Sequence, residues 1–302
     1  MIKIRNFEDR LSSRDPDIIF HNGFYYGCFS SENDTVSIIK SESIEGLSTA
    51  EPHIVYKAEK NRPYSRQLWA PELHVINGKC YIYLAADDGD NHNHRMFVLE
   101  NNSSNPLAPY TLRGKISDTA DRWAIDGTIF RYNGESYFVW SGWAGNRNVC
   151  QNLYIAKMSD EFTLEGEGVM ISTPEYDWEK SGANGEDESP FINEGAYQLT
   201  YNGENYLLYS ASGSWCTDYC IALLKLTGND PLDPRCWEKH PFPILSKNQM
   251  LSGAGHPSVI EKDGVHHVFF HAWDNDEKDI VWNKVSFFHG ILKNENGRFV
   301  IE

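Results

Sequence analysis

Three acidic residues and one histidine lie at nearly the same distance before a turn glycine. Each precedes its glycine by eight residues, or by nine in one case: Asp15, Asp126, His256 and Glu194. Carboxyl groups gathered in a partly dehydrated channel raise each other's pKa, so one can hold a proton at neutral pH while another is ionised. That division supplies the proton donor and the base that hydrolysis of a glycosidic bond needs. Taken singly, an Asp before a strand is more often a turn or cap residue.

The elements that must position these residues form a five-fold repeat. Each unit has a turn dipeptide followed by an alternating aromatic strand: HNGFYYGCFS, INGKCYIYLAA, YNGESYFVWSG, YNGENYLLYSAS and KDGVHHVFFHA. Asn-Gly or Asp-Gly between alternating apolar runs predicts a β-hairpin with a type I′ turn, whose two central residues need positive φ. The turn glycines are 55, 56, 69 and 61 residues apart, which is the length of four short strands.

This repeat predicts an all-β chain in which residues 1–302 form a single five-bladed β-propeller, with blades opening near residues 15, 70, 126, 194 and 256. A β-sandwich would also give many short strands, but it does not account for five matching hairpins. The innermost strands of a propeller begin near the central channel, so the matching residues, Ala70 among them, are expected to converge on one axis. Residues 1–10 and the C-terminal GRFVIE are expected to close the ring and remove exposed strand edges.

Composition narrows the classes of partner. The formal net charge is −16, which repels phosphate and so disfavours nucleic acid and anionic membranes as partners. A neutral sugar meets no such repulsion, and some of the 13% aromatic residues could pack on its C–H faces. No run has the length of a membrane helix, and the first residues lack the apolar stretch of a signal peptide. We expect a cytoplasmic protein, or a secreted one if a leader has been removed.

Five ordered segments resemble the signature segments of glycoside hydrolase family 43, most closely those of its exo-acting α-L-arabinofuranosidases: SRDPDIIFHNGFYY, LWAPELHVINGKCYIYLAA, AIDGTIF, INEGAYQL and GAGHPSVI. The resemblance extends from about residue 12 to 285. It implies that Asp15 is the general base that activates water, that Asp126 tunes and orients the acid, and that Glu194 is the general acid. The family inverts the anomeric configuration, which implies roughly 6.5–9.5 Å between base and acid.

The resemblance also implies residues around the substrate. Trp69 and Ala70 match residues that line the pocket for the terminal sugar, and Trp143 is a candidate second stacking platform; for both Trp residues a place in the core is an equal alternative. His256 matches a channel histidine that in many relatives lies beside a calcium ion, often through water. A histidine hydrogen-bonded in the axis without metal is the alternative, because calcium prefers oxygen ligands.

Two positions depart from the family's pattern. Ala196 follows the acid motif where relatives commonly have proline, and Trp273 stands where many relatives have an arginine that contacts substrate. Trp273 is therefore expected at the substrate, and the preferred sugar is left open. The HNH segment at 92–94 has spacing that could suit a metal, but a solvated or substrate-rim role is favoured.

Taken together, the sequence predicts an inverting hydrolase that releases terminal α-L-arabinofuranosyl residues from arabinan or arabino-oligosaccharides of plant cell walls. No cofactor is required in this prediction, and a calcium ion in the central channel is optional. A β-xylosidase or an endo-α-1,5-arabinanase is the alternative within the family, because loops such as 87–95 and 143–150 set the depth of the pocket. A non-catalytic carbohydrate-binding propeller is the alternative of another class.

Overall fold

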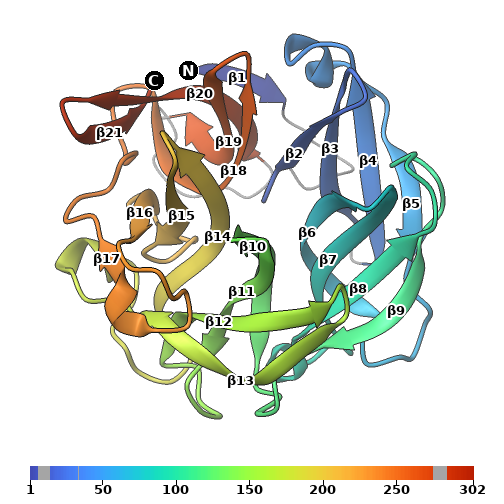
Figure 1. Ribbon diagram of the computed structural model, residues 1–302, viewed down its shortest axis with the longest axis horizontal. Coiled ribbons are helices and arrows are strands. Elements are labelled where there is room, and N and C mark those ends of the chain that lie inside the picture. The colour runs from blue at the N-terminus through green and yellow to red at the C-terminus, as the bar shows by residue number, and fades with distance from the viewer. Residues whose placement is uncertain (6–13, 33, 275–283) are drawn as a thin grey trace.

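The computed structural model describes residues 1–5, 14–32, 34–274 and 284–302, and nearly all of its regular structure is β-strand (Figure 1). Strand pairing gives four sheets, and the largest consists of two four-stranded halves joined by a short parallel contact between β12 and β14. Counted separately, these halves complete five blades around a central axis. The prediction of an all-β propeller is confirmed, and the sheet count fits the predicted five blades.

In the first four blades the strands follow one another in the chain, from the axis outward. The first two blades are β2 (Asp17–His21), β3 (Phe24–Ser31), β4 (Thr35–Ser41) and β5 (His53–Lys57), then β6 (Arg66–Ile76), β7 (Lys79–Asp87), β8 (Arg95–Asn101) and β9 (Thr111–Ile116). The third and fourth are β10 (Ala124–Tyr132), β11 (Glu135–Trp143), β12 (Cys150–Asp160) and β13 (Thr163–Ser172), then β14 (Phe191–Tyr201), β15 (Glu204–Ala211), β16 (Cys220–Leu226) and β17 (Trp237–Lys239).

The fifth blade contains strands from both ends of the chain. It comprises β18 (Leu251–Lys262), β19 (Val265–Asp274), β20 (Ser286–Glu295), β21 (Arg298–Ile301) and β1 (Ile2–Arg5). Both β1 and β21 pair with β20, at its two ends, so the N- and C-termini lie close together in Figure 1. Ring closure by the chain ends is confirmed for these two strands, while residues 6–10 lie outside the described residues. Such closure protects the strand edges.

Each blade opens with the predicted hairpin. The two turn residues have positive φ in all five cases: Asn22–Gly23, Asn77–Gly78, Asn133–Gly134, Asn202–Gly203 and Asp263–Gly264. The flanking residues pair directly across every turn, as His21 does with Phe24. The type I′ hairpins read from the sequence are therefore confirmed.

Connections between strands include four short 3-10 helices: η1 (Glu45–Ser48), η2 (Asn91–Asn93), η3 (Asp177–Glu179) and η4 (Pro234–Cys236). No helix among the described residues is long and apolar enough to cross a membrane.

The apolar core is divided into five clusters, each of which fills the space between two neighbouring blades. Tyr83 of the second blade packs on Phe138 of the third, with ring centroids 5.4 Å apart, and Phe29 of the first blade meets Phe287 of the fifth at 6.2 Å. Burial of each such side chain contributes about 1.5–3 kcal/mol. Because apolar groups fill the spaces between blades, the axis is left to polar side chains.

Candidate active site

A backbone irregularity recurs near the start of every innermost strand. The residue eight positions before each turn glycine has positive φ, between 42° and 58°: Asp15, Ala70, Asp126, Gly195 and His256. In β6, β10, β14 and β18 the strand pairing also shifts register around this residue. A left-handed conformation costs a non-glycine residue about 1–2 kcal/mol, and such strain is concentrated at functional sites. Gly195, and not Glu194, thus occupies the repeat position in the fourth blade.

A cavity of about 340 Å³ opens at this end of the axis. Its walls include the four ionisable residues that the repeat predicted to converge: Asp15, Asp126, Glu194 and His256. We call these four the cavity ring. All four are buried or half-buried, although they lie up to 241 positions apart in the sequence. The propeller therefore brings them together around a space open to a ligand.

Asp15 is the carboxylate of the cavity ring that stays ionised. Its Oδ1 lies 3.3 Å from Nδ1 of His256 and 3.2 Å from Nδ1 of His271. Burial alone would raise the pKa of Asp15, but His256, the Arg14 guanidinium and the His271 hydrogen bond outweigh it and lower the pKa. An ionised carboxylate at the edge of a cavity can accept a proton from water.

Glu194 has the opposite tendency. Burial, and secondarily the negative charge of Asp15, raise the pKa of Glu194 to about 7, although the Tyr219 hydroxyl donates a 2.8 Å hydrogen bond to Oε1 that opposes the shift. A protonated carboxyl facing a cavity can act as a proton donor near neutral pH. Asp15 and Glu194 thus have the divided protonation that general acid–base hydrolysis requires.

Asp126 contacts a neighbour of each of these two carboxyl groups. Its Oδ2 accepts a 3.1 Å hydrogen bond from the backbone N–H of Gly195, the residue after Glu194, and lies 3.8 Å from Nδ1 of His256. Burial and the charges of Glu194 and Asp15 raise its pKa well above the usual range. Asp126 is therefore placed to influence both the position and the protonation of Glu194.

Aromatic side chains line the same cavity. Trp69 is half-buried and stacks on His94, with ring centroids 4.0 Å apart, while Trp215 is 42% exposed. Trp143 does not line the cavity: it is buried and stacks at 4.6 Å behind Trp123, whose ring does reach the wall. Trp123 and Trp215 were not among the predicted residues, although Trp123 directly precedes the AIDGTIF motif.

Two further predicted residues lie behind the site. Ala70 is buried and has the shared positive φ, but it is not part of the cavity wall. Trp273 is fully buried and packs edge-on against His271 at 5.8 Å, so it supports the histidine that touches Asp15. The Trp273 ring therefore does not reach the cavity wall where it was expected.

A second set of polar residues lies two positions further along the same strands and was not anticipated: Asp17, Glu72, Thr128, Tyr197 and Ser258. We call these five the buried ring. The Asp17 carboxylate accepts hydrogen bonds from the Leu73 N–H at 2.6 Å and from the Tyr197 hydroxyl at 3.3 Å, which ties three blades together. The available signal was the two-residue spacing, since residues i and i+2 of a strand share a face.

The described residues do not assemble a metal site around His256. No group of three or more His, Cys, Asp or Glu side chains among them is arranged to hold an ion. Calcium takes six to eight oxygen ligands, whereas His256 offers a nitrogen that already faces Asp15 and Asp126. The donor set therefore does not fit calcium on its own.

Propeller and site together define a glycoside hydrolase. The model for Glycosyl hydrolases family 43 matches residues 10–296, and the chain belongs to that family. The family assignment made from the sequence motifs is confirmed.

Relatives with named activities include arabinofuranosidases. An extracellular exo-α-(1→5)-L-arabinofuranosidase of Streptomyces chartreusis is 32% identical over 83% of this chain and 76% of its own length. An α-L-arabinofuranosidase of Humicola insolens is 34% identical over 84% of this chain, which spans only 53% of that relative. The crystal structure of an α-L-arabinofuranosidase from Lactobacillus brevis superposes with a TM-score of 0.84, at 28% identity, covering 96% of this chain and 94% of that one.

Proposed function

We propose that this protein is an inverting, exo-acting α-L-arabinofuranosidase that removes terminal arabinofuranosyl residues from arabinan or arabino-oligosaccharides. The observation that carries the proposal is the pairing, on one cavity wall, of Asp15 with a lowered pKa and Glu194 with a pKa raised to about 7. The names of the Streptomyces, Humicola and Lactobacillus relatives support the choice of sugar.

Each carboxyl group has one task in the proposed reaction. Asp15 accepts a proton from a water molecule whose oxygen attacks the anomeric carbon, while Glu194 protonates the glycosidic oxygen as its bond to that carbon breaks. Asp126 orients Glu194 through its hydrogen bond with the Gly195 N–H. Both proton transfers in the proposed reaction use side chains of the chain itself, and a calcium ion in the central channel stays a prediction.

Contacts between the loops around the cavity support action at the ends of a polysaccharide substrate. The carboxylate of Glu188 lies in the cavity wall, 3.1 Å from Nε2 of His92 and 3.2 Å from Nδ2 of Asn148. It therefore joins the two loops, 87–95 and 143–150, that were expected to set the depth of the pocket. A cleft walled at one side receives the end of a polysaccharide more readily than its middle.

A panel of aryl glycosides and polymers tests this choice. We expect rapid release from 4-nitrophenyl α-L-arabinofuranoside, slow release from the β-D-xyloside, and arabinose as the first product from linear arabinan. Brisk release from the xyloside alone would favour a β-xylosidase, and oligosaccharides as first products from arabinan would favour an endo-arabinanase. Proton NMR of the first-formed sugar should show the β anomer, and a retained configuration would overturn the inverting mechanism.

The natural substrate follows from the same proposal. A plant cell-wall arabinan, or an oligosaccharide derived from it, presents the terminal arabinofuranosyl groups that the proposed activity needs. The name of the Streptomyces chartreusis relative places that protein outside the cell, and so lends no support to the cytoplasmic location expected from the sequence.

A further inference from the structure

A buried ion pair lies in the fourth blade, away from the cavity. The Nζ atom of Lys239 is 2.6 Å from Oε1 of Glu179, and the two side chains are 7% and 0% exposed. Glu179 ends η3, which precedes the innermost strand β14, while Lys239 ends the outermost strand β17. Removing two charges from water is costly unless hydrogen bonds satisfy both of them.

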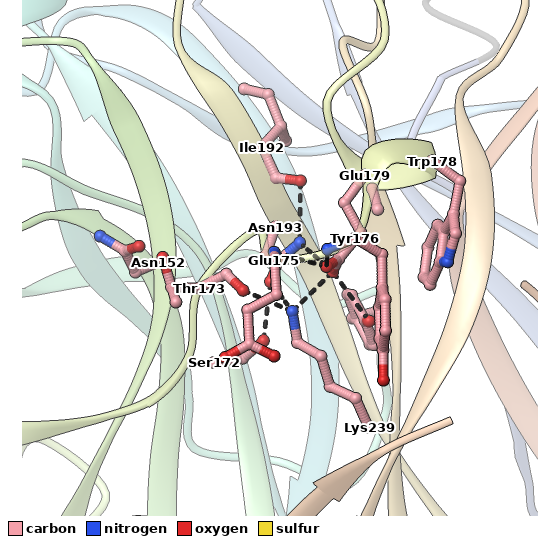
Figure 2. A network of polar contacts seen from close by, with 12 residues as sticks. Asn152, Ser172, Thr173, Glu175, Tyr176, Trp178, Glu179, Ile192, Asn193 and Lys239 are labelled. Carbon is pink, nitrogen blue, oxygen red and sulfur yellow. Dashed lines mark hydrogen bonds and ion pairs between the residues drawn. The ribbon is translucent and has the colours of Figure 1, made fainter. Parts of the chain in front are cut away.

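Hydrogen bonds do satisfy this pair (Figure 2). The Glu179 carboxylate also accepts bonds from the backbone N–H groups of Glu175 and Tyr176, at 2.7 and 2.9 Å, and from the Tyr209 hydroxyl at 3.0 Å. Lys239 donates further bonds to the carbonyl of Thr173 and to a side chain of β14. A buried charge network with so many fixed partners holds its surroundings in one geometry.

Asn193, the residue directly before Glu194, is the side chain of β14 on which this network converges. Its Nδ2 donates to Glu179 at 2.9 Å, and its Oδ1 accepts from Lys239 at 3.1 Å and from Ser172 at 2.7 Å (Figure 2). Its backbone carbonyl accepts a 2.9 Å hydrogen bond from the Ser141 hydroxyl of the third blade. Asn193 is fully buried and is thus fixed through both its side chain and its backbone.

The fixed point matters because regular strand pairing breaks down just beyond it. The pairing of β14 with β15 shifts register between Glu194 and Tyr197, and Gly195 has φ of 58°. Successive side chains of a strand point to opposite faces, so holding Asn193 in the network directs Glu194 toward the axis. Past Glu194 the backbone is irregular, so the ladder alone does not set the direction of the acid.

We propose that Glu179, Lys239 and Asn193 are positioning residues for the general acid Glu194. The inference rests on the proposed function, since it assumes that Glu194 protonates the leaving oxygen. None of the three lines the cavity, so they act through the backbone of β14 and not on the substrate.

The leaving group of the substrate separates this role from a general effect on folding. A poor leaving group needs protonation by Glu194, whereas 2,4-dinitrophenolate departs without it. We expect Lys239→Met to lower kcat on arabinobiose about 10- to 100-fold, as misplacement of a catalytic group does. The same variant should keep most of its kcat on 2,4-dinitrophenyl α-L-arabinofuranoside, and KM should change little. Glu194→Gln, measured in parallel, should show the same selectivity in a larger degree.

Two further variants complete the test. Lys225→Met removes an exposed ion pair with Glu204 on the same blade and should leave both substrates unaffected. Glu179→Gln/Lys239→Met removes both buried charges together, so no charge is left unpaired, and it carries the test if the single variant does not fold.

Equal losses on the two substrates, or no loss on either, would overturn the positioning role. Failure of the proposed function would look different, because the unmodified protein would then hydrolyse neither arabinofuranoside.

Discussion

Four members of the buried ring lie only two or three residues beyond the four members of the cavity ring along the chain, yet the surroundings of the two rings differ. The cavity ring faces a space of about 340 Å³. Burial acts on both carboxyl groups, but their pKa values diverge because Asp15 lies beside His256, the Arg14 guanidinium and the His271 hydrogen bond, whereas Glu194 lies near the negative charge of Asp15. In the buried ring, burial raises the pKa of both Asp17 and Glu72, to about 7 and about 8. Polar residues on this axis are therefore suited to acid–base chemistry only where they face the cavity and where their neighbours shift their pKa values in opposite directions.

The largest expected difference comes from neutralising one carboxylate of each ring at the start of the first blade. Asp15→Asn removes the proposed base and should lower kcat about 10³- to 10⁴-fold on every substrate, whatever its leaving group. Asp17→Asn, two positions along, should keep most of the activity because its partners are protein groups. Rates on 4-nitrophenyl α-L-arabinofuranoside measure both, with circular dichroism as the check on folding. Equal losses of activity in the two variants would contradict the proposal that only the cavity ring takes part in catalysis.

The pH dependence of the cavity ring provides a second test. The pKa of Glu194 is raised to about 7, so the acid is protonated below that pH and kcat should fall as pH rises through it. Asp15 has a lowered pKa and stays ionised, so the acidic limb should lie far below neutrality. Tyr219→Phe removes a hydrogen bond that favours ionised Glu194, and should move the alkaline limb up by about one pH unit. A downward shift would contradict the assignment of Glu194 as the acid.

The raised pKa of Asp17, a member of the buried ring, should make the free energy of unfolding depend on pH. The pKa of Asp17 rises from 3.8 to about 7 on folding, so between those values the folded state keeps a proton that the unfolded state loses. That stabilisation is present at low pH and is lost as pH rises toward 7. Relative to the unmodified protein, Asp17→Asn should therefore gain about 1–3 kcal/mol between pH 5 and pH 8. Urea unfolding at both pH values measures the difference, and a difference that does not change with pH would mean that Asp17 ionises normally.

Removal of metal should have the smallest effect. The described residues near His256 offer no group of three side chains arranged to hold an ion, so we expect EDTA to leave kcat unchanged. A loss of activity restored by added calcium would show that oxygen ligands outside the side chains gathered at the axis, such as water, complete a site. Assays with and without chelator on the same arabinofuranoside decide between these outcomes.

Local patterns made several parts of this structure predictable. A type I′ turn needs two consecutive residues with positive φ, and an Asn-Gly or Asp-Gly dipeptide is enough to predict it. The alternating runs beside the turns gave the hairpins, and the spacing between the turns gave the blades. Counting back from the turn glycines then gave Asp15, Asp126 and His256, because repeat position maps onto distance from the axis.

Other parts depend on contacts that no local pattern encodes. Trp143 was a candidate stacking platform with the core as the equal alternative, and only the tertiary packing decided that it stacks behind Trp123, whose ring reaches the cavity wall. Trp273 stands in a segment that resembles a substrate-contacting one, yet the fold buries its ring against His271. The Glu179–Lys239 pair joins residues 60 positions apart, with no repeat to relate them.

The sequence by itself determined the hairpins, the repeat and the family, because turn geometry and side-chain alternation are properties of a few consecutive residues. Only the tertiary structure decided how the carboxyl groups differ. The pKa of a group depends on burial and on charges a few ångströms away, and these come from several blades at once. The opposite pKa shifts of Asp15 and Glu194, on which their proposed roles as base and acid rest, are therefore a property of the assembled axis.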